Sequence, residues 1–442
     1  MARYQTFTTV GDMGAWVSKL ILELPSTVRA HEVSSALFNV YVERIDTATG
    51  KVSCAKVNFD DVAPLPGCGY VPVRDAYVCD ETGRPAAEGT HVALTLPECR
   101  LTKHIDSEMM GSSIRRMDFR VTQLADIPAE EPDGNPVMGL VFDECTGDVC
   151  PQLAGWHLDA SGTFAGIELN YGWFEPNVAL INAFRAMPGF FHKPPLPEKL
   201  PLVIWLHGAA EGCDPYLSVA GNKAVALSEP DIQGKLGGAA YVLVPASPTF
   251  WMDTENTGQM NDDNQSYYTK ALKALIDEFI AEHAASIDTD RIYIGGLSNG
   301  GFMTCRMIVD YPDFFAAAVP ACAPWVAELS TDEEFAAMAK TPSWWVQSDD
   351  DPIVPPATHF KPTWKRLMAA GATDVHATYY DHIEDETGVY HDADGRPTRF
   401  IGHLVWINVY NDACRTDIDG SLVRCDGFPV TLWQWVGQHT RG

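Results

Sequence analysis

The chain has little positive charge and no long apolar segment. Its 442 residues include 31 Lys and Arg against 59 Asp and Glu, which gives a formal net charge of −28. Nucleic acids and anionic membranes would repel such a chain, so neither is an expected partner. No segment approaches the roughly 20 apolar residues of a membrane span, and the first residues lack the apolar core of a signal peptide. These absences favour a cytoplasmic protein, with secretion by another route left open.

Metal-site spacing is also missing. The 11 cysteines and 13 histidines form no zinc-binding pattern, and no motif indicates an organic cofactor, so we expect neither a metal nor a cofactor. Without a signal peptide, mostly reduced thiols are expected. Two pairs, Cys145 with Cys150 and Cys414 with Cys425, are close enough in sequence to form disulfides, and this alternative stays open.

The length predicts two domains. Residues 1–165 contain short alternating runs separated by turn residues, with no helical pattern between them, which predicts a β-sandwich. The expected strands are 17–24, 36–45, 70–79, 91–96 and 117–124. The histidines of this region are scattered and indicate no catalytic site.

Residues 166–442 alternate strands with helices, which predicts an α/β domain with a mainly parallel sheet covered by helices. The expected strands are 202–206, 240–245, 291–295, 315–320, 343–347 and 374–380, and the expected helices are 265–283, 302–309 and 363–370.

The segment Gly296-Leu-Ser298-Asn-Gly300 lies between an expected strand and an expected helix. A serine in so sharp a strand-to-helix turn is pushed out above the sheet, where its hydroxyl can act as a nucleophile. The two glycines are needed because a Cβ at either place would collide with a neighbouring strand or helix. We therefore predict Ser298 as the nucleophile.

Nucleophilic serines need an oxyanion hole, and its donors are expected from two loops. The residue after the nucleophile supplies one backbone N–H, and an early loop after a strand supplies the other. These are Asn299 and, in the loop after Leu206, Ala209, with Ala210 as the alternative. His207 is interpreted as a residue that braces this loop.

The acid and the base should follow the serine in the order Ser, Asp, His. Three aspartates, 349–351, follow the expected strand 343–347, and the proline-closed loop after them favours Asp351 over Asp349 and Asp350. For the base, the preceding glycine favours His403. The competing candidates are His359, His376, His382 and His391.

Five blocks carry a family resemblance: residues 206–212, 248–253, 291–301, 351–355 and 402–406. They are similar to the poly(3-hydroxybutyrate) depolymerase-like and feruloyl-esterase-like branch of α/β-hydrolases, and more narrowly to esterases of this branch with an N-terminal immunoglobulin-like domain. The resemblance implies that same triad, Ser298, Asp351 and His403. One departure is Ala209-Ala210, where relatives often have glycines.

A serine carboxylic ester hydrolase is therefore the expected function, acting on small or aromatic esters, with polyester left open. Trp251, Trp325 and Trp406 are candidate pocket residues, although core packing explains Trp406 equally well. The acidic segment 383–396 before His403 would disfavour anionic esters. The alternatives are a prolyl-oligopeptidase-type peptidase and a non-catalytic binding protein on the hydrolase fold. The N-terminal domain could bind carbohydrate, cover the active-site edge or form a homo-oligomer.

Overall fold

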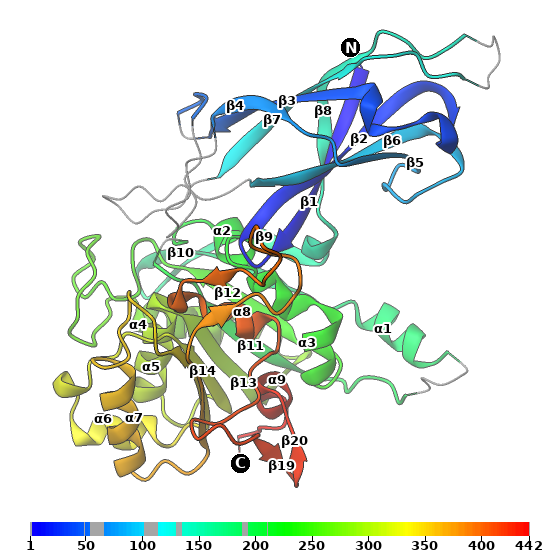
Figure 1. Cartoon of the computed structure of the whole chain (residues 1–442). Helices are drawn as coiled ribbons and strands as arrows, with labels where there is room; N and C mark the ends of the chain where they lie inside the picture. Colours follow the sequence, from blue (N-terminus) through cyan, green and yellow to red (C-terminus); the bar gives the residue numbers. More distant parts are fainter. Residues whose placement is uncertain are drawn as a thin grey trace. The chain divides into compact units, whose positions relative to one another are not determined.

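The computed structural model describes residues 2–47, 49–53, 66–100, 114–129, 135–187, 193–209 and 211–441 (Figure 1). The chain divides into two compact units, Met1–Ala154 with Ala220–Lys223, and Gly155–Val219 with Ala224–Gly442. The boundary expected at residue 165 falls between two strands that pair with each other in the second unit. Sequence alternation alone could not place this boundary, because a hairpin at the start of the second unit has the same pattern as the strands before it.

The first unit is an all-β structure whose strands run in the order β4-β3-β7-β8-β1-β2-β6-β5. Its strands are β1 (Ala2–Gly11), β2 (Gly14–Arg29), β3 (Phe38–Asp46), β4 (Cys68–Val71), β5 (Asp75–Cys79), β6 (Glu88–Arg100), β7 (Arg115–Gln123) and β8 (Val141–Val149). Neighbouring strands are antiparallel except β1 and β8, which are parallel. Apolar side chains from both ends of this strand order share one core, as expected for a β-sandwich.

Strands β1 and β8 were not expected from the sequence. Hydroxyl groups occupy inward positions of β1: Thr6 and Thr8 are buried and both donate to the carboxylate of Asp148 in β8, at 2.6 and 2.7 Å. An apolar alternation pattern cannot detect a polar pair of this kind. The single strand expected over 70–79 is divided into β4 and β5, and Pro72 between them has no N–H to donate to a ladder.

The second unit has an eight-stranded sheet in the order β16-β15-β14-β13-β11-β12-β10-β9. Its strands are β9 (Trp156–Phe164), β10 (Ile167–Phe174), β11 (Leu200–Leu206), β12 (Tyr241–Ala246), β13 (Ile287–Leu297), β14 (Ala317–Ala321), β15 (Ser343–Ser348) and β16 (Val375–Tyr380). Strands β11 to β16 are parallel, and β9 and β10 form an antiparallel edge. Two short hairpins, β17 (Ile383–Glu384) with β18 (Arg399–Phe400) and β19 (Arg424–Cys425) with β20 (Phe428–Pro429), lie outside this sheet.

Helices cover both faces of this sheet (Figure 1). They are α1 (Val178–Arg185), α2 (Pro215–Ala220), α3 (Pro230–Lys235), α4 (Thr269–Glu282), α5 (Asn299–Asp310), α6 (Asp332–Met338), α7 (Phe360–Ala369), α8 (Trp406–Tyr410) and α9 (Leu432–Val436). Short 3-10 turns are η1 (Ala30–Glu32), η2 (Ser35–Leu37), η3 (Pro151–Leu153), η4 (Ala224–Ser228), η5 (Ala327–Leu329) and η6 (Gly402–Leu404). In the described part of the chain, no helix is long and apolar enough to cross a membrane.

The two sheet faces can be read along β11, because successive strand side chains point to opposite faces. Leu202 and Ile204 share a core with α4 and α5, whereas the ring of Trp205 contacts Tyr410 of α8 and Trp433 of α9. Every residue of β11 is buried, as expected for a central parallel strand. The α/β class predicted from the sequence is therefore confirmed.

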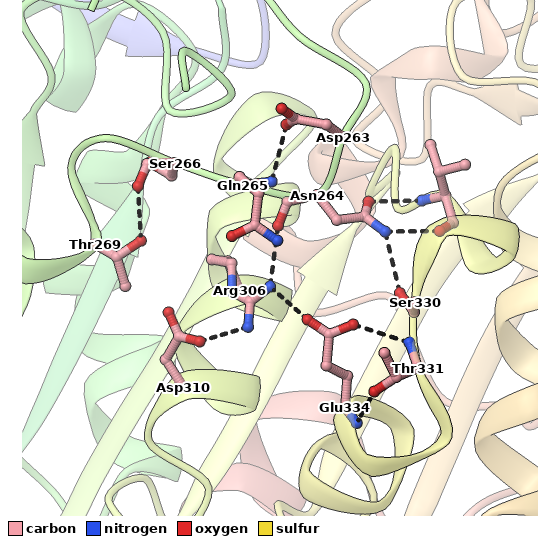
Figure 2. Close-up of polar contacts among 11 residues, drawn as sticks. Asp263, Asn264, Gln265, Ser266, Thr269, Arg306, Asp310, Ser330, Thr331 and Glu334 are labelled. Carbon is pink, nitrogen blue, oxygen red and sulfur yellow. Dashed lines mark hydrogen bonds and ion pairs between the residues drawn. The ribbon is translucent and has the colours of Figure 1, made fainter. Parts of the chain in front are cut away.

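A buried polar cluster attaches three segments of the second unit to one another (Figure 2). Arg306 of α5 donates to the backbone carbonyl of Asn264 at 3.0 Å and to Glu334 of α6 at 2.9 Å, and also pairs with Asp310. The side chain of Asn264 in turn bonds both the N–H and the C=O of Val326, at 2.9 and 2.6 Å. The helix that follows the serine is thus held to the segments before α4 and after β14.

Helix α4 begins at Thr269 and not at residue 265 as expected. The first bond of the expected helix would join the Tyr268 N–H to the Asn264 carbonyl, but that carbonyl accepts from Arg306 and the Tyr268 N–H donates to the Ser266 hydroxyl at 3.1 Å. Asn264 itself has a φ of +58°, a left-handed conformation that asparagine tolerates better than most residues. Tyr268 lies just before α4 and is buried. The helical spacing of apolar residues therefore begins before the helix itself.

We predict that Asn264→Gly lowers the free energy of unfolding by about 1–3 kcal/mol, because it leaves the partly buried N–H of Val326 without its acceptor. Asn264→Ala should cost about 1 kcal/mol more, since alanine does not favour a positive φ. Urea denaturation measures both. Asp426→Gly is the matched control, because Asp426 has a φ of +50° but is exposed. Equal stability of Asn264→Gly and the unmodified protein would contradict the role of this cluster.

Candidate active site

Ser298 lies in a strained turn between β13 and α5. Its φ of +53° and ψ of −116° lie outside the regions that an L-residue prefers, and α5 starts at the next residue. The Ser298 N–H donates to the Ala321 carbonyl at the end of β14, at 2.9 Å. The turn predicted around Ser298 is therefore present, and its backbone strain is confined to the residue that carries the hydroxyl.

The glycines around Ser298 are required by close backbone contacts. A Cβ on Gly300 would lie 2.0 Å from the carbonyl oxygen of Leu206, and one on Gly296 would lie 2.6 Å from the same oxygen. Both distances are far below van der Waals contact, and the atom met is backbone that cannot move aside. The sequence prediction that a side chain at either glycine would collide is confirmed.

His403 connects Ser298 to Asp351. Its Nε2 lies 3.0 Å from the Ser298 hydroxyl, and its Nδ1 lies 2.9 Å from a carboxylate oxygen of Asp351. Since a carboxylate can only accept, Nδ1 carries the proton and Nε2 is free to accept from the serine. His403 and Asp351 are buried, with 3% exposure each. The structure thus brings together the three residues predicted as a triad.

The carboxylate of Asp351 is held in place by its loop. One carboxylate oxygen accepts from the N–H groups of Ile353 and Val354, both at 2.9 Å, and the other accepts from the Gln347 side chain at 3.2 Å. Gln347 was missed at the sequence level. The available signal was a polar residue near the end of a strand that is otherwise largely apolar.

The two neighbouring aspartates have other partners. Asp349 accepts from Lys361 and Tyr379, and Asp350 accepts from Ser348 and Arg399. A Cβ on Gly402 would lie 2.1 Å from a carboxylate oxygen of Asp350. The glycine before His403 therefore lets the histidine loop pack directly on the aspartate loop.

The competing histidines lie elsewhere. His376 is paired with Asp417 at 2.7 Å, His391 is bonded to the Gly388 carbonyl, and His382 lies near Glu384. His359 directly precedes α7. None of these side chains contacts Ser298 among the described residues.

The loop after β11 is braced by His207. This side chain is buried, its Nδ1 bonds the Gly208 carbonyl at 2.6 Å, and its Nε2 accepts from the Ser247 N–H at 3.0 Å. Burial lowers the pKa of His207 to about 4, so the ring is neutral at neutral pH. Glu211 accepts from the Gly208 N–H at 3.2 Å. Ala209 follows Gly208 directly, whereas Ala210 lies outside the described residues.

Asn299 is the first residue of α5, so its N–H has no acceptor within the helix. Its side chain accepts from the backbone N–H of Trp251 at 2.6 Å, which attaches the segment after β12 to the start of α5. The two expected oxyanion donors therefore belong to neighbouring backbone segments, since Gly300 packs on Leu206 and His207.

The three tryptophans expected near a pocket are buried. Trp251 packs on His207 and Tyr268, and Trp325 stacks on Phe302. Both have 0% exposure, which differs from the exposure expected of a pocket wall. Trp406 meets the edge of the His403 ring at a centroid distance of 5.4 Å and is 4% exposed. These indoles support the site from within the core.

No group of three or more potential metal ligands occurs among the described residues. Cys145, Cys150, Cys414 and Cys425 are all free.

Comparisons with known proteins agree with this division. Residues 3–133 match the esterase Ig-like N-terminal domain family, and residues 193–389 match the phospholipase/carboxylesterase family. A crystal structure of a thermostable esterase superposes on 99% of this chain and 100% of its own, with a TM-score of 0.70 and 22% identity, which shows a shared fold.

Two relatives match part of the chain. The poly(3-hydroxyalkanoate) depolymerase C of Paucimonas lemoignei is 30% identical over 183 residues, which are 37% of this chain and 40% of the relative. Cutinase 2 of Thermobifida cellulosilytica is 26% identical over 163 residues, which are 36% of this chain and 56% of the relative. The chain thus spans about half the length of these relatives. It therefore carries an esterase Ig-like N-terminal domain at residues 3–133 and a hydrolase domain of the phospholipase/carboxylesterase family at residues 193–389.

Proposed function

We propose that this chain hydrolyses carboxylic esters through a covalent acyl-enzyme, with Ser298, His403 and Asp351 as the catalytic triad. The observation that carries the proposal is the continuous hydrogen-bonded line from the Ser298 hydroxyl through His403 to Asp351, with distances of 3.0 and 2.9 Å. This line starts at a residue whose backbone strain presents the hydroxyl at the end of the sheet.

In the first step, His403 Nε2 takes the proton of Ser298 while the serine oxygen attacks the ester carbonyl. The alcohol leaves with that proton, and an acyl-serine remains. In the second step, His403 takes a proton from water, the resulting hydroxide equivalent attacks the acyl-serine, and the acid and free serine are regenerated. Asp351 stabilises the cationic form of His403 in both steps.

The backbone N–H groups of Asn299 and Ala209 are proposed to bind the oxyanion that forms in each step. Alanine at position 209 still offers its N–H, so the departure from glycine does not remove a donor. Each donor of this kind contributes about 3 kcal/mol to stabilising the transition state.

Small or aromatic esters are the proposed substrates, with polyester as the alternative that the names of the depolymerase and cutinase relatives support. A prolyl-oligopeptidase-type activity is less well supported, because the N-terminal unit is a single β-structure and matches an esterase Ig-like domain. Assays on short acyl, feruloyl and polyester substrates would separate these classes.

We predict that Ser298→Ala lowers kcat on a p-nitrophenyl short-chain ester by at least about 10³-fold, because no nucleophile remains. Ser298→Gly should do the same and should melt at the same temperature as the parent or higher, since glycine accepts a positive φ. Labelling by a fluorophosphonate probe reports the serine directly. Near-normal turnover by a folded Ser298→Gly protein would disprove the assignment of Ser298 as the nucleophile.

Asp351→Asn should lower kcat by about 10²- to 10⁴-fold, because an amide cannot stabilise the cationic His403. Asp349→Asn is the matched control: its carboxylate is bonded to Lys361 and Tyr379, away from the histidine, and its rate should stay within about twofold. Steady-state kinetics on one ester compare the two. Similar losses in both variants would show that Asp351 is not the specific acid.

The neutral, buried His207 predicts acid sensitivity. Its pKa falls from an ordinary value of 6.5 to about 4, so its contribution to stability is complete above pH 6.5 and is lost as the pH falls toward 4. Between pH 7 and pH 4.5 the parent should lose about 2–3 kcal/mol that His207→Gln does not lose. Urea titrations at both pH values measure this, with exposed His391→Gln as the control. If the free energy of unfolding of His207→Gln depended on pH as strongly as that of the parent, His207 would not be the cause of the acid sensitivity.

A further inference from the structure

A hollow of about 430 Å³ lies in the second unit next to the proposed oxyanion loop. One side is formed by Cys213, which follows that loop, and another by Pro248 after β12; the Cys213 thiol donates to the Pro248 carbonyl at 2.7 Å. The start of β10 contributes Glu168 and Asn170. Because β10 runs antiparallel to β12, its start lies at the sheet edge where β12 ends, which is the edge that carries Ser298.

The remaining wall is a loop that carries Asn256 and Tyr267. Burial opposes ionisation of Asp253, but N–H groups of Glu255, Thr257 and Gly258 and the Thr249 hydroxyl outweigh it, so the pKa of Asp253 is lowered. This carboxylate therefore holds the loop around Asn256.

Tyr267 is anchored on both sides. Its N–H donates to the Asp253 carbonyl at 2.9 Å, and the Asn264–Arg306 cluster of Figure 2 lies just before it in the chain. The hydroxyl of Tyr268 donates to Asn256 Oδ1 at 2.6 Å. A wall built in this way is preorganised, so a ligand would not have to order it.

The polar groups of the hollow define the chemistry of its ligand. Among the described residues, no hydrogen bond uses the Glu168 carboxylate, the Tyr267 hydroxyl or the Asn256 Nδ2, and no lining residue is cationic. An anion would find no positive partner, and an apolar chain would desolvate these groups without compensation. Hydroxyl groups, which both donate and accept, match a set that contains carboxylate, phenol and amide.

We propose that this hollow is a subsite for a neutral, polyhydroxylated alcohol portion of the ester substrate, such as glycerol or a sugar. The proposal rests on the proposed ester hydrolysis at Ser298. Glu168 and Asn256 hydrogen-bond the hydroxyls, and Tyr267 offers an aromatic face to the carbon skeleton. The subsite would explain how an acidic hydrolase gains substrate affinity without a positive charge.

The test compares four butyrate esters that differ in the alcohol: ethyl, glyceryl, glucosyl and choline butyrate. We expect kcat/KM for the glyceryl or the glucosyl ester to exceed that for the ethyl ester at least about tenfold, mainly through KM. Comparison of the glyceryl ester with the glucosyl ester shows whether the subsite prefers glycerol or a sugar. In Glu168→Ala and in Tyr267→Ala this preference ratio should fall about tenfold. Glu333→Gln, an exposed carboxylate of α6, controls for loss of charge and should leave the ratio unchanged.

Blocking the hollow provides a second readout. A bulky methanethiosulfonate reagent on the exposed Cys213 should raise KM for the preferred polyol ester more than for ethyl butyrate. Cys213→Ser is the control, because other exposed thiols, such as Cys68 and Cys145, remain in it. The reagent should leave KM of this variant unchanged.

The outcomes separate this proposal from the one before it. Absence of hydrolysis of all four esters would refute the proposed function itself. Hydrolysis of ethyl butyrate without a polyol preference, or a preference that survives in Glu168→Ala and Tyr267→Ala, would overturn the subsite alone. A preference for the choline ester that is lost in Glu168→Ala would replace the polyol by a cationic alcohol.

Discussion

The contact between the Gly296–Gly300 turn and the end of β11 determines the arrangement of the candidate site. Backbone packs directly on backbone there, since a Cβ on Gly300 would lie 2.0 Å from the Leu206 carbonyl oxygen. Because of this contact, the sharp change of chain direction is concentrated at Ser298, whose φ is +53°. It also sets the loop that contains His207 and Ala209 beside the first residue of α5. One packing contact therefore positions the residues proposed as nucleophile and oxyanion donors.

Two further devices keep this edge of the sheet rigid. The Asp351 loop is closed by two backbone N–H groups on one carboxylate oxygen, and the His403 loop packs on Asp350 through Gly402. On the other side, Asn299 bonds the Trp251 N–H, and Arg306 with Asn264 holds the segments that flank α5. The groups of the proposed triad are thus held in place by buried hydrogen bonds, a preorganised arrangement of the kind that the proposed reaction requires.

The elements that the sequence predicted well are those with strong local patterns. The strand-to-helix turn at Ser298 was predictable because glycine spacing and flanking apolar runs are local consequences of its geometry. Asp351 and His403 followed from chain order and from loops after strands, once a parallel sheet was expected. Strands β1 and β8 were missed, because Thr6 and Thr8 bury their hydroxyls on Asp148 and break the apolar alternation. The start of α4 was misplaced, because the Asn264 carbonyl and the Tyr268 N–H bond to Arg306 and to Ser266 and not to each other.

The class of each unit, the likeness to Ig-bearing esterases and the prediction of Ser298 as the nucleophile came from the sequence alone, because these depend on periodicity and on short motifs. The sequence favoured Asp351 among three adjacent aspartates, and the tertiary structure shows that its carboxylate is the one that contacts His403, because this contact depends on the direction of each side chain. The same holds for Trp251 and Trp325, which are core residues by burial although they stand beside motifs in sequence. The hollow beside the oxyanion loop is likewise a tertiary feature, since its walls come from segments between Gly166 and Tyr267 that meet only when the sheet has formed.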